Sequence, residues 1–544
     1  MKPNIILITI VTFCLFLKGF AQIPGTQNFW FVAEEAAATL PIVNPFAIFG
    51  ATAGDNSSFS VSDAGDVNGD GYDDFIVGAY NADPGGRTSA GMSYVVFGKE
   101  TPADVDLADV ESETGSLGFP IIGADAGDKS GYRVSKAGDV NNDGLDDVLV
   151  GAYYAEPGGK ARAGTAYVVF GKTTTTPIEL SDIENQTGTL GFAINGADIG
   201  DELTYGLSHL GDINGDGYDD IVVGARYASP GGSAEGSSYV VFGKPTNTPI
   251  EVVDIETETG SLGFVINGVD SADNSGFVVS GGRDVNNDGL NDILIGAARA
   301  APGGKLRAGT AYLVFGKTST TPIALADIEA ETPGLGFAMH GAVAGDRAGF
   351  SLDFAGDVNG DGIEDILVGS GYADRGGLDL VGLSSVVFGK TTATAIQLSD
   401  IEADTGNHGF AMHGSEERDY SGYIVSAAGD ANGDGLDDVL IGAWGAQSNV
   451  GAAYVVFGRT ATTPINLADV QSDTGDHGYA INYTPEVGGG SFGFSASSAG
   501  DVNADGLDDV IVGSHYLDPL GRINTGASYV VFGKNADTAP VVVN

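Results

Sequence analysis

The sequence predicts an all-β fold: a β-propeller of seven four-stranded antiparallel blades, the last of which is closed by a strand from the N-terminus. Two observations predict this fold. First, one acidic nine-residue stretch occurs seven times, at 66–74, 139–147, 212–220, 284–292, 357–365, 430–438 and 501–509, with steps of 71 to 73 residues. Second, four short runs of β-forming residues accompany each copy, separated by Gly, Asp and Pro. A unit repeated at this period is typical of radial architectures, which protect the edges of their sheets.

The second repeat shows the four predicted strands most clearly, at Tyr132–Ala137, Val148–Ala152, Thr165–Phe170 and Phe192–Asn195. The linker before the fourth strand is expected to form a helical turn outside the blade. The first three strands occur in all seven repeats, but the fourth follows only six of them. Its missing copy stands at 45–50, so we expect this N-terminal segment to complete the seventh blade.

Each nine-residue stretch has the chemistry of a calcium loop. Positions 1, 3, 5 and 9 are Asp, Asn, Asp and Asp in all seven copies, and position 6 is Gly. Ca²⁺ takes about six to eight oxygen ligands and is often bound at a sharp turn, where position 7 would add its backbone carbonyl. Carboxylates crowded into one turn would repel one another without a cation. The sequence therefore predicts up to seven structural Ca²⁺ ions.

The predicted metal ligands are the residues at positions 1, 3, 5, 7 and 9 of the seven loops. They are Asp66, Asn68, Asp70, Tyr72, Asp74, Asp139, Asn141, Asp143, Leu145, Asp147, Asp212, Asn214, Asp216, Tyr218, Asp220, Asp284, Asn286, Asp288, Leu290, Asp292, Asp357, Asn359, Asp361, Ile363, Asp365, Asp430, Asn432, Asp434, Leu436, Asp438, Asp501, Asn503, Asp505, Leu507 and Asp509. Position 8 varies between Asp, Asn and Glu, and its side chain is expected to be solvated. The alternative interpretation is an acidic turn that binds no metal.

The loop is not predicted to be an EF-hand. An EF-hand carries a glutamate at position 12 and continues into a helix. Position 12 is Val or Ile here, inside an apolar run such as 147–151 that reads as a buried strand. We therefore expect each ion in a loop between two strands.

The chain divides into four segments. Residues 1–21 have the charge and apolar core of a secretory signal peptide, followed by an N-terminal extension at 22–44, the propeller at 45–534 and a C-terminal tail at 535–544. The single cysteine, Cys14, lies in the leader, so no disulfide is expected after its removal. No later apolar run approaches ~18 residues, which argues against a membrane span. These features predict a secreted, extracellular or cell-surface protein.

The net charge argues against negatively charged partners. The formal charge is −49, and 27 of the 73 acidic residues lie in the seven loops. Bound calcium would neutralise part of this charge, but the remainder stays strongly negative. The composition therefore argues against nucleic acid or an anionic membrane surface as a partner.

The stretch from Ala137 to Ala152, Ala-Gly-Asp-Val-Asn-Asn-Asp-Gly-Leu-Asp-Asp-Val-Leu-Val-Gly-Ala, resembles the FG-GAP repeat of the integrin α-subunit propeller and its bacterial relatives. The resemblance covers about 45–534 and implies the propeller fold, the metal loops and partner binding on the face away from those loops. This chain departs from the family pattern in two respects. The Phe-Gly pair is complete only at Phe492-Gly493, and all seven repeats carry the calcium loop.

Residues that break the repeat just after the second strand of each blade are the candidate ligand contacts. They are Tyr80, Tyr153, Arg226, Arg299, Tyr372, Trp444 and His515. Symmetry brings these positions together near the central rim, where such side chains suit sugars or extended peptides. The alternative is that the rings pack between blades.

The function predicted from these features is a binding or adhesion module for an extracellular protein or glycan. Basic residues in the turns after the second strands, such as Lys160, Arg162 and Arg375, would attract an anionic partner, unless they are merely solvated. The alternative function is a polysaccharide-degrading, lyase-like enzyme, for which His515 is the one candidate residue on the rim. One histidine without a defined partner does not identify a catalytic site, and no catalytic residue is assigned.

Overall fold

The computed structural model describes residues 45–99, 101, 103–229, 234–258, 261–484, 490–534 and 539–544. They fall within one compact unit, Asn44–Asn544. The predicted signal peptide at 1–21 and the extension at 22–44 lie outside the described residues.

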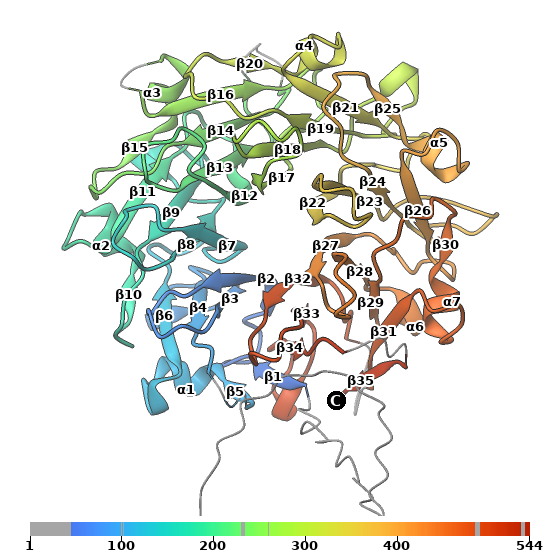
Figure 1. Cartoon of the computed structure of the whole chain (residues 1–544). Helices are drawn as coiled ribbons and strands as arrows, with labels where there is room; N and C mark the ends of the chain where they lie inside the picture. The colour runs from blue at the N-terminus through green and yellow to red at the C-terminus, as the bar shows by residue number, and fades with distance from the viewer. Residues whose placement is uncertain are drawn as a thin grey trace, which may run out of the picture. The chain divides into compact units, whose positions relative to one another are not determined.

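Seven sheets are arranged radially around a central channel, which confirms the predicted seven-bladed propeller (Figure 1). We number the blades 1 to 7 in the order of their acidic loops, and call these loops 1 to 7. The innermost strand of each blade, strand A, is β2 (Ser57–Gly65), β7 (Arg133–Gly138), β12 (Leu203–Gly211), β17 (Val278–Arg283), β22 (Ser351–Gly356), β27 (Ile424–Gly429) or β32 (Ser495–Gly500).

The next three strands of each blade pair antiparallel, as predicted. Strand B is β3 (Asp74–Ala79), β8 (Asp147–Ala152), β13 (Asp220–Ala225), β18 (Asp292–Ala297), β23 (Asp365–Ser370), β28 (Asp438–Ala443) or β33 (Asp509–Ser514). Strand C is β4 (Met92–Val96), β9 (Thr165–Val169), β14 (Ser237–Val241), β19 (Thr310–Val314), β24 (Leu383–Val387), β29 (Ala452–Val456) or β34 (Ala527–Val531). Strand D is β6 (Gly118–Ile122), β11 (Gly191–Asn195), β16 (Gly263–Asn267), β21 (Gly336–His340), β26 (Gly409–His413), β31 (Gly478–Tyr483) or β1 (Phe46–Phe49).

Each blade has a fifth strand that the sequence did not predict. It pairs parallel to strand D and comes from the linker of another repeat, or from the chain end in blade 6: β5 (Val105–Asp106), β10 (Ile178–Glu179), β15 (Ile250–Glu251), β20 (Ile323–Ala324), β25 (Ile396–Gln397), β30 (Ile465–Asn466) and β35 (Val541–Val543). Two or three residues are too few for an alternating pattern to be recognised. These strands fasten each blade to the next one along the chain.

The helical turn expected in the linker is present. It follows the fifth strand as α1 (Leu107–Glu111), α2 (Leu180–Glu184), α3 (Val252–Glu256), α4 (Leu325–Glu329), α5 (Leu398–Glu402) and α7 (Leu467–Gln471), while α6 (Ala446–Asn449) lies between β28 and β29. Within α2, Leu180 and Ile183 are buried against the blade. No helix among the described residues combines the length and the hydropathy that crossing a bilayer requires.

The N-terminal strand closes the ring, as predicted. β1 pairs antiparallel with β34, with Phe46 opposite Val530 and Phe49 opposite Ala527. At the other end of the chain, β35 pairs parallel with β31, so Val541–Val543 belongs to blade 6. Both ends of the described chain are therefore held in sheets, and neither sheet is left with a long free edge.

The apolar core lies between the blades. All six residues of every strand B are buried, because each blade is covered on both faces by its neighbours. One cluster joins Phe192 and Ile194 of blade 2 to Ile221 and Tyr239 of blade 3. Burial on both faces explains why the strand B sequences are continuous apolar runs.

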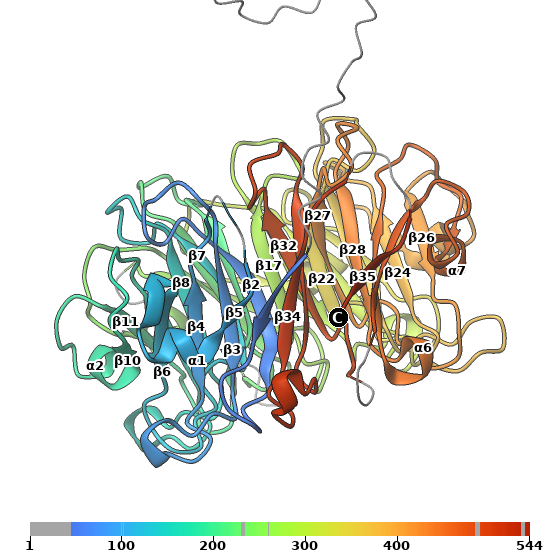
Figure 2. The ribbon, with the colours of Figure 1, turned by 90° about the horizontal axis from the view of Figure 1, so that it is seen from below.

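The antiparallel order of strands A to D divides the connections between two faces of the disc. We call the face that carries the A–B loops and the C–D linkers the loop face, and the opposite face, with the B–C and D–A turns, the turn face. In Figure 2 the strands run across the thickness of the disc between these faces. Turns of the turn face contact one another: the N–H of Gly200, in a D–A turn, donates to the carbonyl of Ala161, in a B–C turn, at 3.0 Å.

We expect Ile48→Asp to destabilise the propeller by at least about 3 kcal/mol, because it places a carboxylate in the closing strand where no part of the side chain is exposed. Val542→Asp is the matched control, since Val542 also lies in a terminal strand but is 53% exposed. Denaturant unfolding measures both. Equal effects would contradict the closure by β1.

Candidate functional site

The first aspartate of each acidic loop organises the loop through its carboxylate. In loop 2, the carboxylate of Asp139 accepts the backbone N–H groups of Asp143 and Gly144, both at 2.9 Å. The carboxylate of Asp143 in turn accepts the N–H of Leu145 at 3.1 Å. The same three bonds recur in the other six loops. All seven loops therefore share one fold.

The aspartate at position 9 is fully buried at the start of strand B. In loop 2, Asp147 accepts the N–H of Val140 at 3.0 Å and that of Gly171 at 2.8 Å. Burial raises the pKa of Asp147 to about 8; the bond from Gly171 opposes the rise, and the charges of Asp143 and Asp139 add to it. The pKa of the equivalent carboxyl is raised mainly by burial to about 8 at Asp74, Asp220, Asp365, Asp438 and Asp509, and to about 7 at Asp292. A nearby cation would favour the ionised form of each carboxyl.

The loops offer further oxygens that fit a hard cation. The buried side-chain oxygens of Asn286 and Asn432, at position 3 of loops 4 and 6, accept no hydrogen bond within the described residues. An unpaired buried acceptor is costly, and Ca²⁺ binds such oxygens. Among the described residues, no three carboxylate, histidine or cysteine side chains already form a metal cluster. The loops therefore contain oxygen side chains of the kind that Ca²⁺ binds. The carboxylates at positions 1 and 5 also accept hydrogen bonds from the loop's own backbone.

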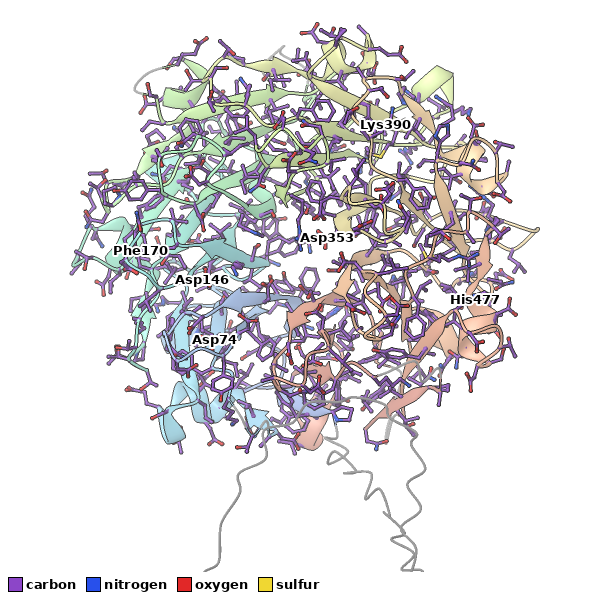
Figure 3. All side chains as sticks on the ribbon, viewed as in Figure 1. Asp74, Asp146, Phe170, Asp353, Lys390 and His477 are labelled. Atoms are coloured by element: carbon purple, nitrogen blue, oxygen red, sulfur yellow. The ribbon has the colours of Figure 1, made fainter. Side chains whose placement is uncertain are left out.

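The expectation that position 8 is solvated is wrong for most loops. Asp146 of loop 2 accepts the backbone N–H of Asp66, in loop 1, at 2.9 Å. Its side chain is 26% exposed. The side chain at position 8 contacts the neighbouring blade. This contact joins two repeats, so the sequence of one repeat does not reveal it. In Figure 3, Asp74 and Asp146 lie in adjacent blades.

A closed ring of seven aromatic side chains surrounds the channel. We call it the aromatic collar; it consists of Phe59, Tyr132, Tyr205, Phe277, Phe350, Tyr423 and Phe494. Neighbouring ring centroids are 4.7 to 5.4 Å apart around the whole circle. The collar lines a cavity of about 380 Å³. Sequence reasoning missed it, although an aromatic residue stands at this position of every repeat.

Five of the seven predicted ligand contacts pack against this collar with their rings. Tyr80 and His515 contact Phe59, with centroids 4.7 and 5.1 Å away. The remaining three are Tyr153 against Tyr132 at 4.3 Å, Tyr372 against Phe350 at 5.2 Å, and Trp444 against Tyr423 at 5.9 Å. The structure therefore brings these residues together, in contacts that fit the packing alternative.

The two predicted arginines differ. Arg226 lies 3.5 Å from the ring centroid of Tyr205 and pairs with Glu202 at 2.5 Å. Arg299 is exposed, and its backbone N–H donates to the carbonyl of Asp273. Arg226 thus contacts the collar, whereas no collar contact of Arg299 occurs in the described part of the chain.

His515 is enclosed by the rings around it. It is 2% exposed, and burial lowers its pKa to about 4, so it is neutral at physiological pH. Phe494 packs against it, with centroids 4.3 Å apart. A catalytic base must reach its substrate. This environment gives the enzymatic alternative no support.

On the loop-face side of the collar, the channel contains a polar chamber of about 630 Å³. One position of strand A lines it in all seven blades: Ser62, Ser135, Ser208, Ser280, Asp353, Ser426 and Ser497. Asp353 breaks the pattern and accepts hydrogen bonds from the hydroxyls of Ser280 at 2.8 Å and Ser426 at 2.9 Å. Figure 3 shows Asp353 near the centre of the ring.

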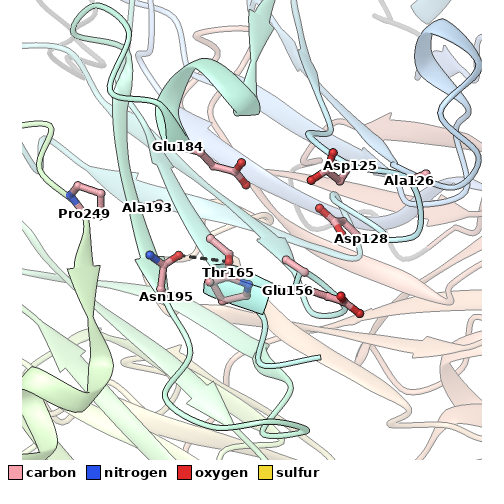
Figure 4. Close-up of a pocket in the computed structure, with 12 residues that line it drawn as sticks. Asp125, Ala126, Asp128, Glu156, Thr165, Glu184, Ala193, Asn195 and Pro249 are labelled. Carbon is pink, nitrogen blue, oxygen red and sulfur yellow. Dashed lines mark hydrogen bonds between the residues drawn. The ribbon is translucent and has the colours of Figure 1, made fainter. Parts of the chain in front are cut away.

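An acidic pocket of about 340 Å³ opens on the turn face of blade 2 (Figure 4). Asp125, Asp128, Glu156 and Glu184 line it, and no Lys or Arg of the described residues forms an ion pair with them. Burial, with Asp125 as the next cause, raises the pKa of Asp128 to about 7. The carboxylates therefore lack an internal counter-ion.

Blade 5 fills the equivalent place with its own cation. Arg375 donates to the carboxylate of Asp346 at 2.7 and 3.1 Å and to that of Glu402 at 2.5 Å. These two acids occupy the repeat positions of Asp128 and Glu184, and Arg375 that of Pro157. In blade 2, the hydroxyl of Tyr167 donates to the carboxylate of Glu184 at 2.6 Å. Blade 5 has the shorter Ser385 at the repeat position of Tyr167. The same acid pair thus accommodates a guanidinium in one blade and is open in another.

Comparison with known proteins agrees with this geometry. The FG-GAP repeat profile matches residues 59–96, 130–169, 207–241 and 492–531, in blades 1, 2, 3 and 7. The chain carries FG-GAP repeats. The FG-GAP propeller is 28% identical to Integrin alpha-PS2 of Drosophila melanogaster over 279 residues, which is 47% of this chain and 18% of that protein.

Two further relatives match this chain over similar lengths. Integrin alpha-8 of Gallus gallus is 28% identical over 238 residues, or 43% of this chain and 19% of its own. Phosphatidylinositol-glycan-specific phospholipase D of Rattus norvegicus is 26% identical over 226 residues, or 39% of this chain and 24% of its own. The FG-GAP propeller therefore spans less than a quarter of each of these longer proteins.

We expect Asp143→Asn to remove one bound Ca²⁺ ion from a full set of seven. Position 5 is exposed, so the free energy of unfolding in EDTA should change little, whereas the melting temperature in saturating Ca²⁺ should fall. Asp476→Asn, an exposed acid in a linker, is the control. The number of bound ions is measured by elemental analysis. If both variants retained the same number, the assignment of position 5 as a ligand would be wrong.

Proposed function

We propose that this FG-GAP propeller is an extracellular binding or adhesion module that holds up to seven structural Ca²⁺ ions and binds a protein partner through its turn face. The distribution of exposed apolar side chains carries this proposal. Within the described residues, every exposed large apolar side chain except Val253 and Val542 lies in a B–C or D–A turn: Ile199, Leu306, Val343, Leu378, Tyr516, Leu520 and Ile523. Exposed apolar groups gathered on one face are typical of a protein interface.

Two neighbouring turns make the surface continuous around blade 4. The N–H of Gly345 donates to the carbonyl of Leu306 at 3.1 Å, which holds Leu306 beside the turn that contains Val343. Leu306 is 74% exposed and Val343 is 51% exposed. This apolar surface favours a protein partner over the glycan that the sequence left open.

The acidic pocket of blade 2 favours a partner with exposed basic groups. Among the basic residues of the B–C turns, Arg87 pairs with Glu179 at 2.8 Å, Arg375 with Asp346 at 2.7 Å and Arg522 with Asp106 at 2.6 Å. These arginines are therefore neutralised within the propeller. The acidic pocket of blade 2 is not, and its counterpart in blade 5 accommodates a guanidinium.

The loop face has a different task in this proposal. Ca²⁺ supplied by the extracellular medium would hold the A–B hairpins through residues such as Asp139, Asp143 and Asp147, and would offset the repulsion among their carboxylates. The protein then presents the turn face on a rigid disc. The relatives named integrins are consistent with a module of this kind within a longer protein.

Binding to a panel of extracellular proteins and glycans, with the protein immobilised in Ca²⁺, tests the function. Leu306→Ser removes exposed apolar surface, and Pro157→Arg copies the internal cation of blade 5 into the acidic pocket. Val253→Ser, an exposed apolar residue of α3 outside the B–C and D–A turns, is the control. A protein ligand that binds wild type and the control, but binds either turn-face variant at least about tenfold more weakly, supports the proposal. Glycan-only binding, or binding insensitive to both variants, would refute it.

A further inference from the structure

The residue at position 8 links each acidic loop to the loop before it. Asp146 of loop 2 accepts the N–H of Asp66 through its carboxylate at 2.9 Å, and its own N–H donates to the carbonyl of Asp66 at 3.2 Å. Asp66 is position 1 of loop 1, whereas Asp146 is bonded in sequence to Asp147, position 9 of loop 2. One residue therefore holds the backbone of one predicted metal ligand and adjoins another.

The same link joins three other pairs of loops. The carboxylate at position 8 accepts the N–H of position 1 at 2.9 Å for Asp219 and Asp139, at 2.7 Å for Asp437 and Asp357, and at 2.9 Å for Asp508 and Asp430. In each pair the reciprocal backbone bond is also present, at 3.2 to 3.3 Å. Loops 1, 2 and 3 are thus joined in one series, and loops 5, 6 and 7 in another.

A glycine before each linked loop makes room for the carboxylate. A Cβ atom on Gly65 would lie 2.1 Å from the carboxylate oxygen of Asp146, and one on Gly356 would lie 2.2 Å from that of Asp437. Gly65 also has a φ of +69°, which side chains rarely adopt. This accounts for the glycine that precedes the first aspartate of the four linked loops, Gly65, Gly138, Gly356 and Gly429.

The link is absent around loop 4. Asn291, at position 8 of loop 4, donates its amide to the carbonyl of Leu210 at 2.6 Å instead of accepting from Asp212. At the next junction, Arg283 replaces the glycine and Glu364 replaces the aspartate. These two side chains form an ion pair at 3.6 Å, and within the described residues the N–H of Asp284 donates no hydrogen bond to the carboxylate of Glu364. Both changes occur together, as expected if the glycine and the short carboxylate act as one unit.

The link is also absent where the ring closes. Within the described residues, the N–H of Asp501 makes no hydrogen bond to Asp73, the position 8 residue of loop 1. Three junctions therefore lack the carboxylate link, and four have it.

We propose that the position 8 carboxylates couple neighbouring metal loops, so that loops 1–3 and loops 5–7 bind Ca²⁺ as two cooperative groups and loop 4 binds separately. This inference rests on the calcium binding proposed above. An ion in loop 2 would fix Asp147 and therefore Asp146, which holds the backbone of Asp66 in the geometry that loop 1 needs. By linkage, an ion in loop 1 favours binding in loop 2 by the same factor. Position 8 is thus a positioning residue and not a ligand.

Two tyrosines at position 7 allow individual loops to be observed. Tyr72 lies in loop 1 and Tyr218 in loop 3, while the other loops have Leu or Ile at this position. Tyrosine sensitises the luminescence of Tb³⁺, a calcium analogue. Position 7 side chains also lie near the preceding loop, as Leu145 does beside Gly69. Emission that is lost on both Tyr72→Leu and Asp70→Asn therefore reports loop 1. Emission lost on both Tyr218→Leu and Asp216→Asn reports loop 3.

The test titrates Tb³⁺, and then Ca²⁺ in competition, into the full chain from Gln22 onward. Asp146→Ala removes the link between loops 1 and 2, together with the ion pair of Asp146 with Lys136 at 3.6 Å, but leaves all predicted ligands in place. We expect it to weaken binding in loop 1 about fivefold to tenfold, the effect of losing one charge-assisted hydrogen bond, and to leave loop 3 within about twofold. Asn291→Ala is the matched control, because its side chain does not hold Asp212, and it should leave loop 3 unchanged.

A second variant adds a link between two loops. Its result therefore does not depend on whether the fold tolerates the loss of a hydrogen bond. Asn291→Asp places a carboxylate beside Gly211, where a glycine already makes room, and should tighten binding in loop 3. Tyrosine-sensitised binding that is unchanged by both Asp146→Ala and Asn291→Asp would overturn the coupling while leaving calcium binding intact. Absence of tyrosine-sensitised Tb³⁺ binding in wild type would overturn the calcium proposal itself.

Discussion

The buried carboxylate that begins every strand B is the feature on which the rest of the structure depends. Asp147 and five of its six equivalents tie the acidic loop to the strand and to the start of the C–D linker through two backbone N–H groups, and Asp438 accepts the linker N–H of Gly458. An anion in this position is costly, as its raised pKa shows. In the calcium-bound form proposed above, a cation would offset that cost while bringing the loop's oxygens together. The ion and the hairpin would then stabilise each other at each of the seven loops.

The departures from sevenfold symmetry are as informative as the repeats. Arg375 and Ser385 together replace a proline and a tyrosine, and the acid pair of blade 5 gains an internal cation. Arg283 and Glu364 together replace a glycine and an aspartate, and a hydrogen-bonded link becomes a partly exposed ion pair. Paired changes of this kind indicate that each local contact is maintained as a unit. Blade 2 keeps the proline and the tyrosine of the repeat, so its acid pair has no internal cation among the described residues.

Much of the fold could be predicted from the sequence because the repeat itself carries the information. The repeat period and the continuous apolar strands were enough to predict seven blades. Strand D follows only six of the seven repeats, which predicted closure by the N-terminal segment, and β1 confirms that closure. The fifth strands were not predictable, because two residues in a linker carry no periodic signal. The loop residues are predicted to be metal ligands from their chemistry, since oxygen side chains at fixed spacing suit one class of ion, and this assignment stays a prediction.

The rest of the site depends on contacts between repeats, which reading one repeat does not reveal. Position 8 looked solvated because its partner, such as Asp66 for Asp146, lies about one repeat away in the chain. The aromatic collar was missed for the same reason: each ring occupies an ordinary strand position, and only closure brings the seven together. His515 looked available on the rim, yet the collar encloses it. Conversely, the acidic pocket combines the D–A turn, the B–C turn and α2, three segments well separated in the sequence.

The measurement that tests this account most directly is the calcium content of the purified protein, combined with thermal unfolding in Ca²⁺ and in EDTA. The account predicts close to seven ions per chain and a melting temperature that falls strongly when EDTA removes them. A protein that holds no calcium and melts at the same temperature in both conditions would show that the acidic loops need no cation, and would contradict it.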